Sequence, residues 1–212
     1  MISHTIPGTP ERSIPMTQTI RRSKEDLRQK RTRHLLVQAL VALLEEQSFS
    51  SLSVVDICQR AMVHRTTFYA HFEDKQALLH YTIESILQEF EISAASPSLS
   101  PHDFFLAVAH SALVFLSQHR SLFQVGLGTQ DHFGALALES TLSQRMSQHL
   151  TQPSFQGILG DLNPEITAHF YAGAMASLVY WWVEHNMPVT EEVLVRHLDH
   201  FLPGRSVCAE KG

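Results

Sequence analysis

The chain has 212 residues and a formal net charge of −5 at pH 7, with two cysteines, Cys58 and Cys208. This length suits one or two domains with a substantial core, and cysteines so far apart in the sequence do not make a metal-type pair. The longest apolar stretch, Phe170–Val183, is shorter than the roughly 20 residues that cross a bilayer, so we expect a cytoplasmic protein without a membrane contact.

Charge is distributed unevenly along the chain. Residues 1–75 hold 11 Lys and Arg against 8 Asp and Glu, whereas residues 76–212 hold 5 against 13. The negative total alone argues against nucleic-acid binding, but the N-terminal third is positive and has the potential to bind phosphates.

The N-terminal segment divides into a leader and a long helix. Residues 1–21 contain three prolines and no apolar run, which predicts a disordered leader and not a signal peptide. A helix is expected over roughly Lys24–Gln47, because its apolar residues follow the spacing of one buried stripe: Leu36, Ala39, Leu40, Leu43 and Leu44. A basic run leads into it, formed by Arg21, Arg22, Lys24, Arg28, Lys30, Arg31 and Arg33. This run is either a phosphate-binding arm or a solvated one.

Two short helices joined by a tight turn are predicted next. Ser53 is a good N-cap with Asp56 in the capping-box position, and the first helix should end near Ala61. Met62 and Val63 leave room only for a turn. The second helix would then begin at His64 or Arg65 and bury Phe68 and Phe72, four residues apart. Its exposed face would carry His64, Arg65, Thr66, Thr67 and Tyr69. This pattern predicts a helix-turn-helix that binds the major groove of DNA.

The same stretch resembles the tetracycline-repressor (TetR) family of regulators. The matching residues are Val63, Arg65, Thr67, Phe68, Tyr69, His71, Phe72 and Lys75, and the resemblance extends from Thr32 to about Phe90. Met62 and Ser48 stand where the family usually has glycine, so a positive φ would be costlier there. His64 replaces the more usual Ser or Asn of the family. The resemblance implies an all-α fold with an N-terminal three-helix DNA-binding domain and a helical regulatory and dimerisation domain.

Residue roles follow from these positions. Arg65 and Thr66, with His64, are expected to contact base edges, whereas Ser53, Thr67, Tyr69 and Lys75 are expected to position the DNA backbone. For Thr67 a local capping role is the alternative.

The rest of the chain is predicted to be helical. Asp74 can cap a fourth helix that continues to about Phe90, and Pro97 and Pro101 forbid a continuous helix beyond it. Further helices are expected at about 102–118, 120–127, 131–150, 164–186 and 190–202. We therefore predict a DNA-binding domain at 22–75, a ligand-binding and dimerisation domain at 76–205, and a tail at 206–212.

The segment Asn163–His185 combines small residues with large aromatic ones. Ala172, Gly173 and Ala176 would let another helix approach closely, and Tyr180 and Trp181 offer contact area. Because Trp181 and Trp182 are adjacent, one should pack inside the subunit while the other meets a partner or a pocket. The segment resembles the family's penultimate helix, which implies a homodimer built through a four-helix bundle. Ordinary core packing is the alternative.

No catalytic motif or phosphate-binding loop is present, so an enzyme is not expected. His197 and His200 lie three apart but lack further ligands nearby, so we predict no metal, and the sequence indicates no cofactor. The resemblance implies a repressor that binds a palindromic operator and is released by an unknown small-molecule effector, whose contacts the sequence does not identify. The main alternative is a helical binding or adaptor protein that keeps the fold without reading DNA.

Overall fold

The computed structural model describes residues 16–96, 99–126, 132–155 and 159–202, with backbone only for residues 16–25, 126 and 132. Every regular element within these ranges is helical, which confirms the predicted all-α fold. The predicted tail and residues 1–15 of the predicted leader lie outside the described residues, as do the side chains of Arg21, Arg22 and Lys24. Residues 16–21 are helical, so the prediction of a disordered leader is wrong for them. The elements are α1 (Met16–Leu44), the 3-10 turn η1 (Phe49–Ser51), α2 (Val54–Ala61), α3 (Arg65–Tyr69), α4 (Lys75–Ala94), α5 (Pro101–Gln118), the π-helical turn η2 (Leu122–Gly126), α6 (His132–Leu150), α8 (Pro164–Glu184) and α9 (Glu191–Phe201).

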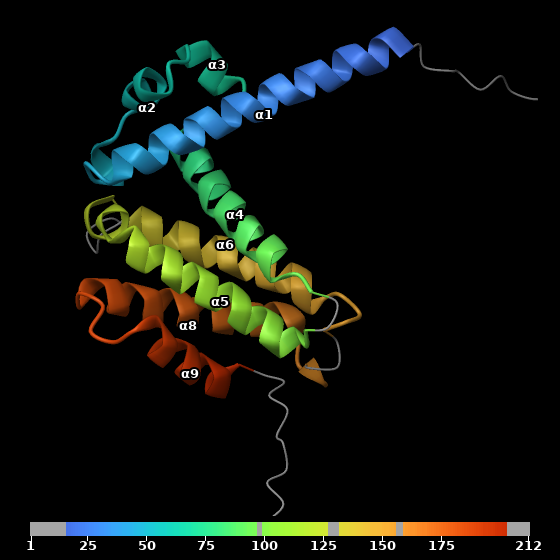
Figure 1. Cartoon of the computed structure of the whole chain (residues 1–212), viewed down its shortest axis with the longest axis vertical. Coiled ribbons are helices and arrows are strands. Elements are labelled where there is room, and N and C mark those ends of the chain that lie inside the picture. The colour runs from blue at the N-terminus through green and yellow to red at the C-terminus, as the bar shows by residue number, and fades with distance from the viewer. Residues whose placement is uncertain (1–15, 97–98, 127–131, 156–158, 203–212) are drawn as a thin grey trace, which may run out of the picture.

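The N-terminal unit is organised around α1. Figure 1 shows α2 and α3 on one side of α1, and α4 leading from this unit toward the remaining helices. The five apolar residues predicted as one stripe of α1 are all buried, in a core shared with Phe49, Ile57 and Phe68. Helix α1 ends at Leu44 and not at the predicted Gln47, because the amides of Glu46 and Gln47 both donate to the Leu43 carbonyl and close a turn.

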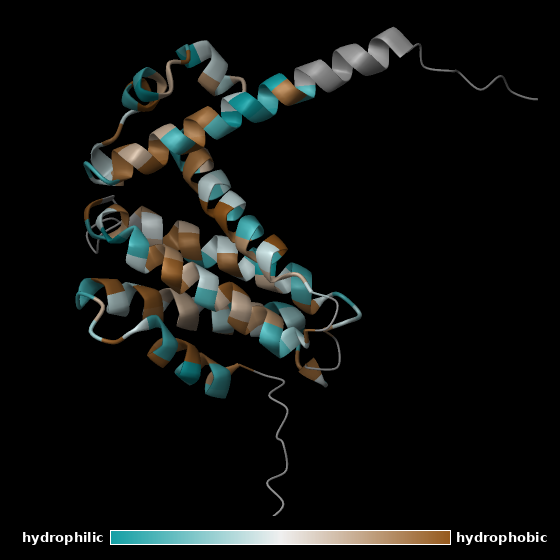
Figure 2. Ribbon diagram, in the orientation of Figure 1, coloured by the Kyte–Doolittle hydropathy of each residue, from teal (hydrophilic) through white to brown (hydrophobic). Residues whose placement is uncertain are grey.

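The remaining helices form a second packed body below the first. Helix α6 lies along α8, α5 lies along α9, and α4 contacts both α5 and α6 as well as α1. In Figure 2 the hydrophobic residues of these helices gather where neighbouring helices face each other. Trp182 is buried in this core, and its Nε1 donates to the Val189 carbonyl at 2.8 Å. Helix α4 is therefore an element shared by both bodies.

The ends of these helices follow the caps expected from the sequence. The Asp74 side chain accepts from the Ala77 amide at 2.7 Å and starts α4. The Asn163 side chain accepts from the amides of Glu165 and Ile166 and starts α8, with Pro164 in its first turn. The segment predicted as a helix over 120–127 is the shorter π-helical turn η2. None of the helices in the described ranges is long and apolar enough to span a membrane.

Candidate functional site

Helix α2 starts at a complete capping box. The Ser53 Oγ accepts from the Asp56 amide at 3.2 Å, and the Ser53 amide donates to Asp56 Oδ2 at 2.9 Å. The Ser53 hydroxyl also donates to the same carboxylate at 2.6 Å. The two bonds that the carboxylate accepts, first from the Ser53 hydroxyl and then from the Ser53 amide, lower the pKa of Asp56 from its ordinary value, because both stabilise the charged form. The Ser53 side chain is thus committed to capping in this structure, and a DNA phosphate would have to compete with Asp56 for it.

The turn after α2 is held by a left-handed residue. Met62 has φ 54° and ψ 42°, its amide donates to the Gln59 carbonyl, and the Val63 amide donates to the Cys58 carbonyl at 3.0 Å. This pair of bonds is the Schellman arrangement, in which glycine is the usual left-handed residue. The positive φ at Met62 is the conformation for which the sequence predicted a conformational cost without glycine. Ser48 has φ −66°, so it carries no such cost. The turn directs the chain into α3.

Helix α3 is short and is oriented by its aromatic residues. Phe68 is fully buried, with its ring centroid 5.9 Å from that of Phe72 and 5.4 Å from that of Tyr69. With Phe68 held inward, the opposite side and the start of the helix face outward. His64, Arg65, Thr66 and Tyr69 are exposed and Thr67 is half-buried. Of these predicted DNA contacts, the structure groups His64, Arg65 and Thr66 at the exposed N-terminal end of α3.

Lys75 has a different place from the one predicted. Its Nζ donates to the carbonyls of Phe49 at 2.8 Å, Ser50 at 3.1 Å and Leu52 at 2.7 Å, and lies 4.8 Å from the centre of the Phe49 ring. An ammonium group has three hydrogens to donate, so in this structure all of them are directed at η1 and the residue after it. The phosphate contact predicted for Lys75 stays a prediction, and a phosphate would have to compete with these three carbonyls for the ammonium group. Lys75 closes the loop between α1 and α2.

Other basic residues of α1 remain on the surface. Arg28, Lys30 and Arg31 are exposed on α1. Arg33 is half-buried, with its guanidinium carbon 5.7 Å from the centre of the Tyr81 ring of α4. Three described members of the predicted basic run are therefore free of the core, whereas Arg33 joins α1 to α4.

The predicted dimer residues of α8 separate into different environments. Ala172 and Ala176 are 1% and 6% exposed and pack inside the subunit. They are therefore not on the surface of the subunit, where the predicted dimer interface would need them. A Cβ at Gly173 would lie 3.8 Å from Glu139 Oε1, so Gly173 faces α6. Small residues in α8 allow it to pack closely on α6, because two helices inside one subunit need the same close approach as two helices at a dimer interface.

One tryptophan of the α8 pair packs inside the subunit, as predicted, whereas the partner contact of the other stays a prediction. Trp182 is buried, whereas Trp181 is 42% exposed. Trp181 ends an outward stripe on α8 that also contains Ile166 and Phe170, at 70% and 69% exposed, with Ala174 and Ser177 between them. These five residues, at i, i+4, i+8, i+11 and i+15, share one face of the helix. We call them the outer α8 stripe, and no signal in the sequence separated them from the buried alanines.

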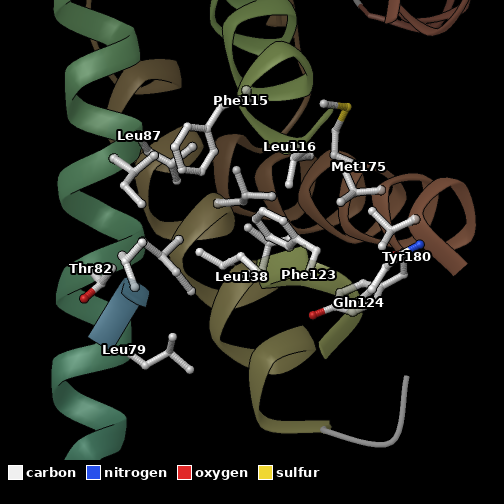
Figure 3. Close-up of a pocket in the computed structure, with 18 of the residues that line it drawn as sticks. Leu79, Thr82, Leu87, Phe115, Leu116, Phe123, Gln124, Leu138, Met175 and Tyr180 are labelled. Carbon is white, nitrogen blue, oxygen red and sulfur yellow. The ribbon is translucent and has the colours of Figure 1, made fainter. Parts of the chain in front are cut away.

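A cavity of about 440 Å³ lies mainly inside the second body, and Val41 of α1 also lines it. Figure 3 shows side chains from α4, α5, η2, α6 and α8 converging on it. Its lining is mostly apolar and includes Ile83, Ile86, Leu87, Phe90, Phe115, Leu116, Phe123, Leu138, Leu142, Met175 and Val179. Tyr180, predicted at the dimer interface, lines this cavity. Such a volume and lining are typical of small-molecule sites.

An enclosed charged cluster joins α4 to α6 near the cavity. Arg145 donates two hydrogen bonds to Glu91, one from Nε at 2.7 Å and one from Nη2, and its Nη1 lies 3.6 Å from Glu84 Oε1. His149 Nε2 is 3.2 Å from Glu91 Oε1. Burial alone would raise the pKa of Glu91, but the bonds from Arg145 and His149 outweigh it and lower the pKa from 4.5 to about 2. Glu91 is thus held ionised. Within the described ranges, no group of three or more His, Cys, Asp or Glu side chains could hold a metal ion.

Comparison with known proteins agrees with this geometry. Residues 36–82 match the family model of bacterial regulatory proteins, tetR family. The chain is 27% identical over 181 residues to an uncharacterized HTH-type transcriptional regulator, YxbF of Bacillus subtilis (strain 168), covering 84% of this chain and 46% of that protein. The chain thus spans about half the length of this curated relative.

Two solved structures share the fold. A putative TetR-family regulator from Syntrophomonas wolfei superposes with a TM-score of 0.58 at 19% identity, covering 81% of this chain and 93% of that one. The regulator FadR from Bacillus subtilis, solved in complex with stearoyl-CoA, superposes with a TM-score of 0.50 at 14% identity, covering 78% and 94%. The matched family and these neighbours are transcriptional regulators and not enzymes. The capped α2, the left-handed turn and the outward-facing α3 all lie inside the segment that matches the tetR-family model, so residues 36–82 form a helix-turn-helix similar to that of the tetR-family regulators.

Proposed function

We propose that the protein binds a palindromic operator as a homodimer and that a small molecule in the cavity releases it from DNA. The observation that carries this proposal is the exposed polar start of α3, which is anchored from behind by the buried Phe68. Side chains at the N-terminal end of such a helix are the ones that meet base edges in the major groove. Release by a ligand makes the protein a repressor.

The proposed DNA contacts fall into two groups. Arg65 and Thr66, with His64, contact base edges, since they are exposed at the start of α3. Arg28, Lys30 and Arg31 of α1 contact phosphates, together with Tyr69 and Thr67 of α3. Lys75 acts indirectly, because its ammonium holds the carbonyls of the α1–α2 connection.

Dimerisation is proposed through the outer α8 stripe. Ile166, Phe170 and Trp181 are large apolar side chains exposed on one helix face, and Phe201 of α9 is a further exposed one at 67%. A two-fold interface uses the same patch of both subunits, so the two α3 helices would be related by the same axis. The half-sites would then lie one helical turn, about 34–36 Å, or a small multiple apart.

The effector is proposed to act through α4 and η2. Helix α4 lines the cavity with Leu79, Ile83 and Leu87 and also contacts α1. The turn η2 contributes Leu122 and Phe123 to the cavity lining, and both also pack in the core of the DNA-binding unit. A ligand between these elements favours one placement of α1 to α3 over another, to the extent that its affinity differs between the two states.

The test is fluorescence anisotropy with DNA from upstream of the protein's own gene, at two salt concentrations. We expect salt-dependent, sequence-selective binding by wild type. Arg65→Ala should cost roughly 1–3 kcal/mol and relax preference at one base pair, whereas Arg196→Ala, which removes an exposed arginine of α9, should bind as wild type does. Equal, weak binding to operator and scrambled DNA would instead favour a helical adaptor protein that keeps the fold without reading DNA.

A further inference from the structure

The cavity has one polar end. Apart from Thr82, its polar lining consists of Gln124, Tyr180, Glu184 and Asn186, which come from η2, the last turns of α8 and the residues just beyond it. Figure 3 shows Gln124 beside Tyr180 on the opposite side of the cavity from Thr82. Thr82 donates its hydroxyl hydrogen to the Leu78 carbonyl at 2.8 Å, within its own helix. The other end of the cavity is therefore apolar.

The polar end is kept in place by the connection after α8. Gln124 Nε2 donates to Asn186 Oδ1 at 3.0 Å, and the Arg120 guanidinium donates to the Asn186 carbonyl. Asn186 and Met187 both have positive φ, at 59° and 54°. The Met187 amide donates to the Trp182 carbonyl at 2.7 Å, which ties this connection to the buried end of α8. The side chains around the polar end are thus positioned before any ligand arrives.

The described lining of the cavity carries negative charge only. Among the 21 lining residues in the described part of the chain, none is Lys, Arg or His, and Glu184 is the single charged one. Glu184 is exposed, so it stands where the cavity meets solvent. Arg120 is not part of the lining, and its guanidinium is directed at the Asn186 carbonyl. An anionic head would therefore lose water and face the Glu184 carboxylate with no cationic side chain among the described lining residues, whereas a cationic head would gain Glu184 as an opposite charge.

We infer that the cavity binds a compact amphiphile with an apolar body and a cationic or neutral hydrogen-bonding head, and that it discriminates against carboxylates and other anions. The inference rests on the proposed effector role of the cavity. The apolar body would lie among the α4, α5 and α6 side chains, with the head beside Gln124, Tyr180 and Glu184. The volume of about 440 Å³ lies in the lower part of the range for small-molecule sites, about 300–1,000 Å³.

Three probes with one tail and different heads test this inference on the full chain. Dodecyltrimethylammonium and dodecanoate are titrated below their micelle-forming concentrations and dodecanol below its solubility limit, with binding measured by calorimetry and by fluorescence of Trp181 and Trp182. The expected order of affinity is cation, then alcohol, then carboxylate. Glu184→Gln should weaken the cation about fivefold, as for a solvent-accessible ion pair, leave the alcohol unchanged and tighten the carboxylate.

Two further variants locate the effect. Glu89→Gln removes an exposed carboxylate of α4 that does not line the cavity, and it should leave all three affinities unchanged. Ala112→Phe adds a ring to the lining and should weaken all three probes alike. Unchanged binding of the cation by Ala112→Phe would place the site elsewhere and overturn the inference.

The outcomes separate the ligand class from the proposed function. Carboxylate binding as tight as cation binding, or binding of none of the three probes, would overturn the inference. DNA release by dodecanoate alone would overturn it while leaving the effector mechanism in place. Cation binding with the expected response of Glu184→Gln, but with no effect on DNA affinity, would support the ligand class and refute the proposed release mechanism.

Discussion

The DNA-binding unit and the larger helical body achieve their functional surfaces in opposite ways. In the DNA-binding unit, α2, its turn and α3 are adjacent in sequence. Buried aromatic rings fix the inner side of α3, so a few polar residues lie on its outer side. In the second, the candidate site is a space enclosed by side chains from residues as far apart as Val41 and Asn186. The comparison teaches that an outward-facing site can be encoded locally, whereas an enclosed site depends on how distant helices meet.

The two regions also differ in how they use charge. The Arg60–Glu46 pair of the DNA-binding unit is 2.6 Å long with both side chains on the surface, at 37% and 58% exposed. Arg145 and Glu91 are only 15% and 14% exposed and hold α4 against α6. Removing water from a charged pair makes the loss of one partner more costly, so the larger body should depend more on its ion pair.

The largest effect should come from the ring that anchors α3. Phe68→Ala removes a fully buried side chain and should lower the free energy of unfolding by about 3–5 kcal/mol. Phe115→Ala, at a half-buried ring of the cavity lining, should cost only about 1–2 kcal/mol, since it enlarges an existing space. Urea unfolding measures both values. Equal losses of unfolding free energy in the two variants would show that the cavity lining is packed as tightly as the core around Phe68.

The next effect separates the two ion pairs. Arg145→Met should lower the free energy of unfolding by about 2–4 kcal/mol at pH 7, because Glu91 keeps its enclosed charge without its main partner. Arg60→Met, at the exposed pair, should cost less than about 1 kcal/mol. Denaturant unfolding of both variants is the measurement.

The Arg145 effect should also depend on pH. The folded-state pKa of Glu91 is lowered from 4.5 to about 2, so its contribution is present above the unfolded pKa and is lost as pH falls toward about 2. The difference between wild type and Arg145→Met should therefore narrow as pH falls through this window. A difference that stays constant over the same window would show that Arg145 stabilises the fold by packing and not by charge.

A pair of lysines tests which charges serve folding and which serve DNA binding. Lys75→Met removes three hydrogen bonds to carbonyls and should cost about 2 kcal/mol of unfolding free energy. Lys30→Met, at an exposed lysine of α1, should leave stability unchanged, weaken binding to all DNA sequences alike and reduce the salt slope by about 1. Thermal unfolding and anisotropy on both variants decide the matter. The reverse pattern would restore the phosphate role for Lys75.

The smallest effect should be a gain. Met62 is left-handed and 90% exposed, so Met62→Gly relieves backbone strain without losing packing and should stabilise the protein by about 0.5–1 kcal/mol. Met187 is also left-handed but packs against the core of the larger body, so Met187→Gly should destabilise it. Melting temperatures compare the two, and a loss of stability in Met62→Gly would mean that the turn does not need a left-handed residue.

Several features could be predicted because short-range patterns specify them. The Ser53–Asp56 capping box, the Asp74 cap of α4 and the buried stripe of α1 each depend on residues within a few positions of one another. The division between the inner Trp182 and the outer Trp181 follows from helical geometry alone. The sequence therefore predicted the helices, their caps and the outward residues of α3.

Other features depend on which helices become neighbours. Small side chains suit a dimer contact and an internal contact equally, and only the packing of α8 within the helical body places Ala172 and Ala176 inside. Likewise, a lysine beside a DNA-binding helix is compatible with a phosphate or with a carbonyl cluster, and only the approach of η1 to α4 decides between them.

The sequence alone predicted that the protein is helical, that it contains a helix-turn-helix resembling that of the TetR family, and that Arg65 and Thr66 are exposed, because helix periodicity and capping act over a few residues. Only the tertiary structure decided the carbonyl contacts of Lys75, the outward face of α8 and which side chains line the cavity. These depend on contacts between residues distant in the chain, and no local pattern specifies which distant side chains will meet.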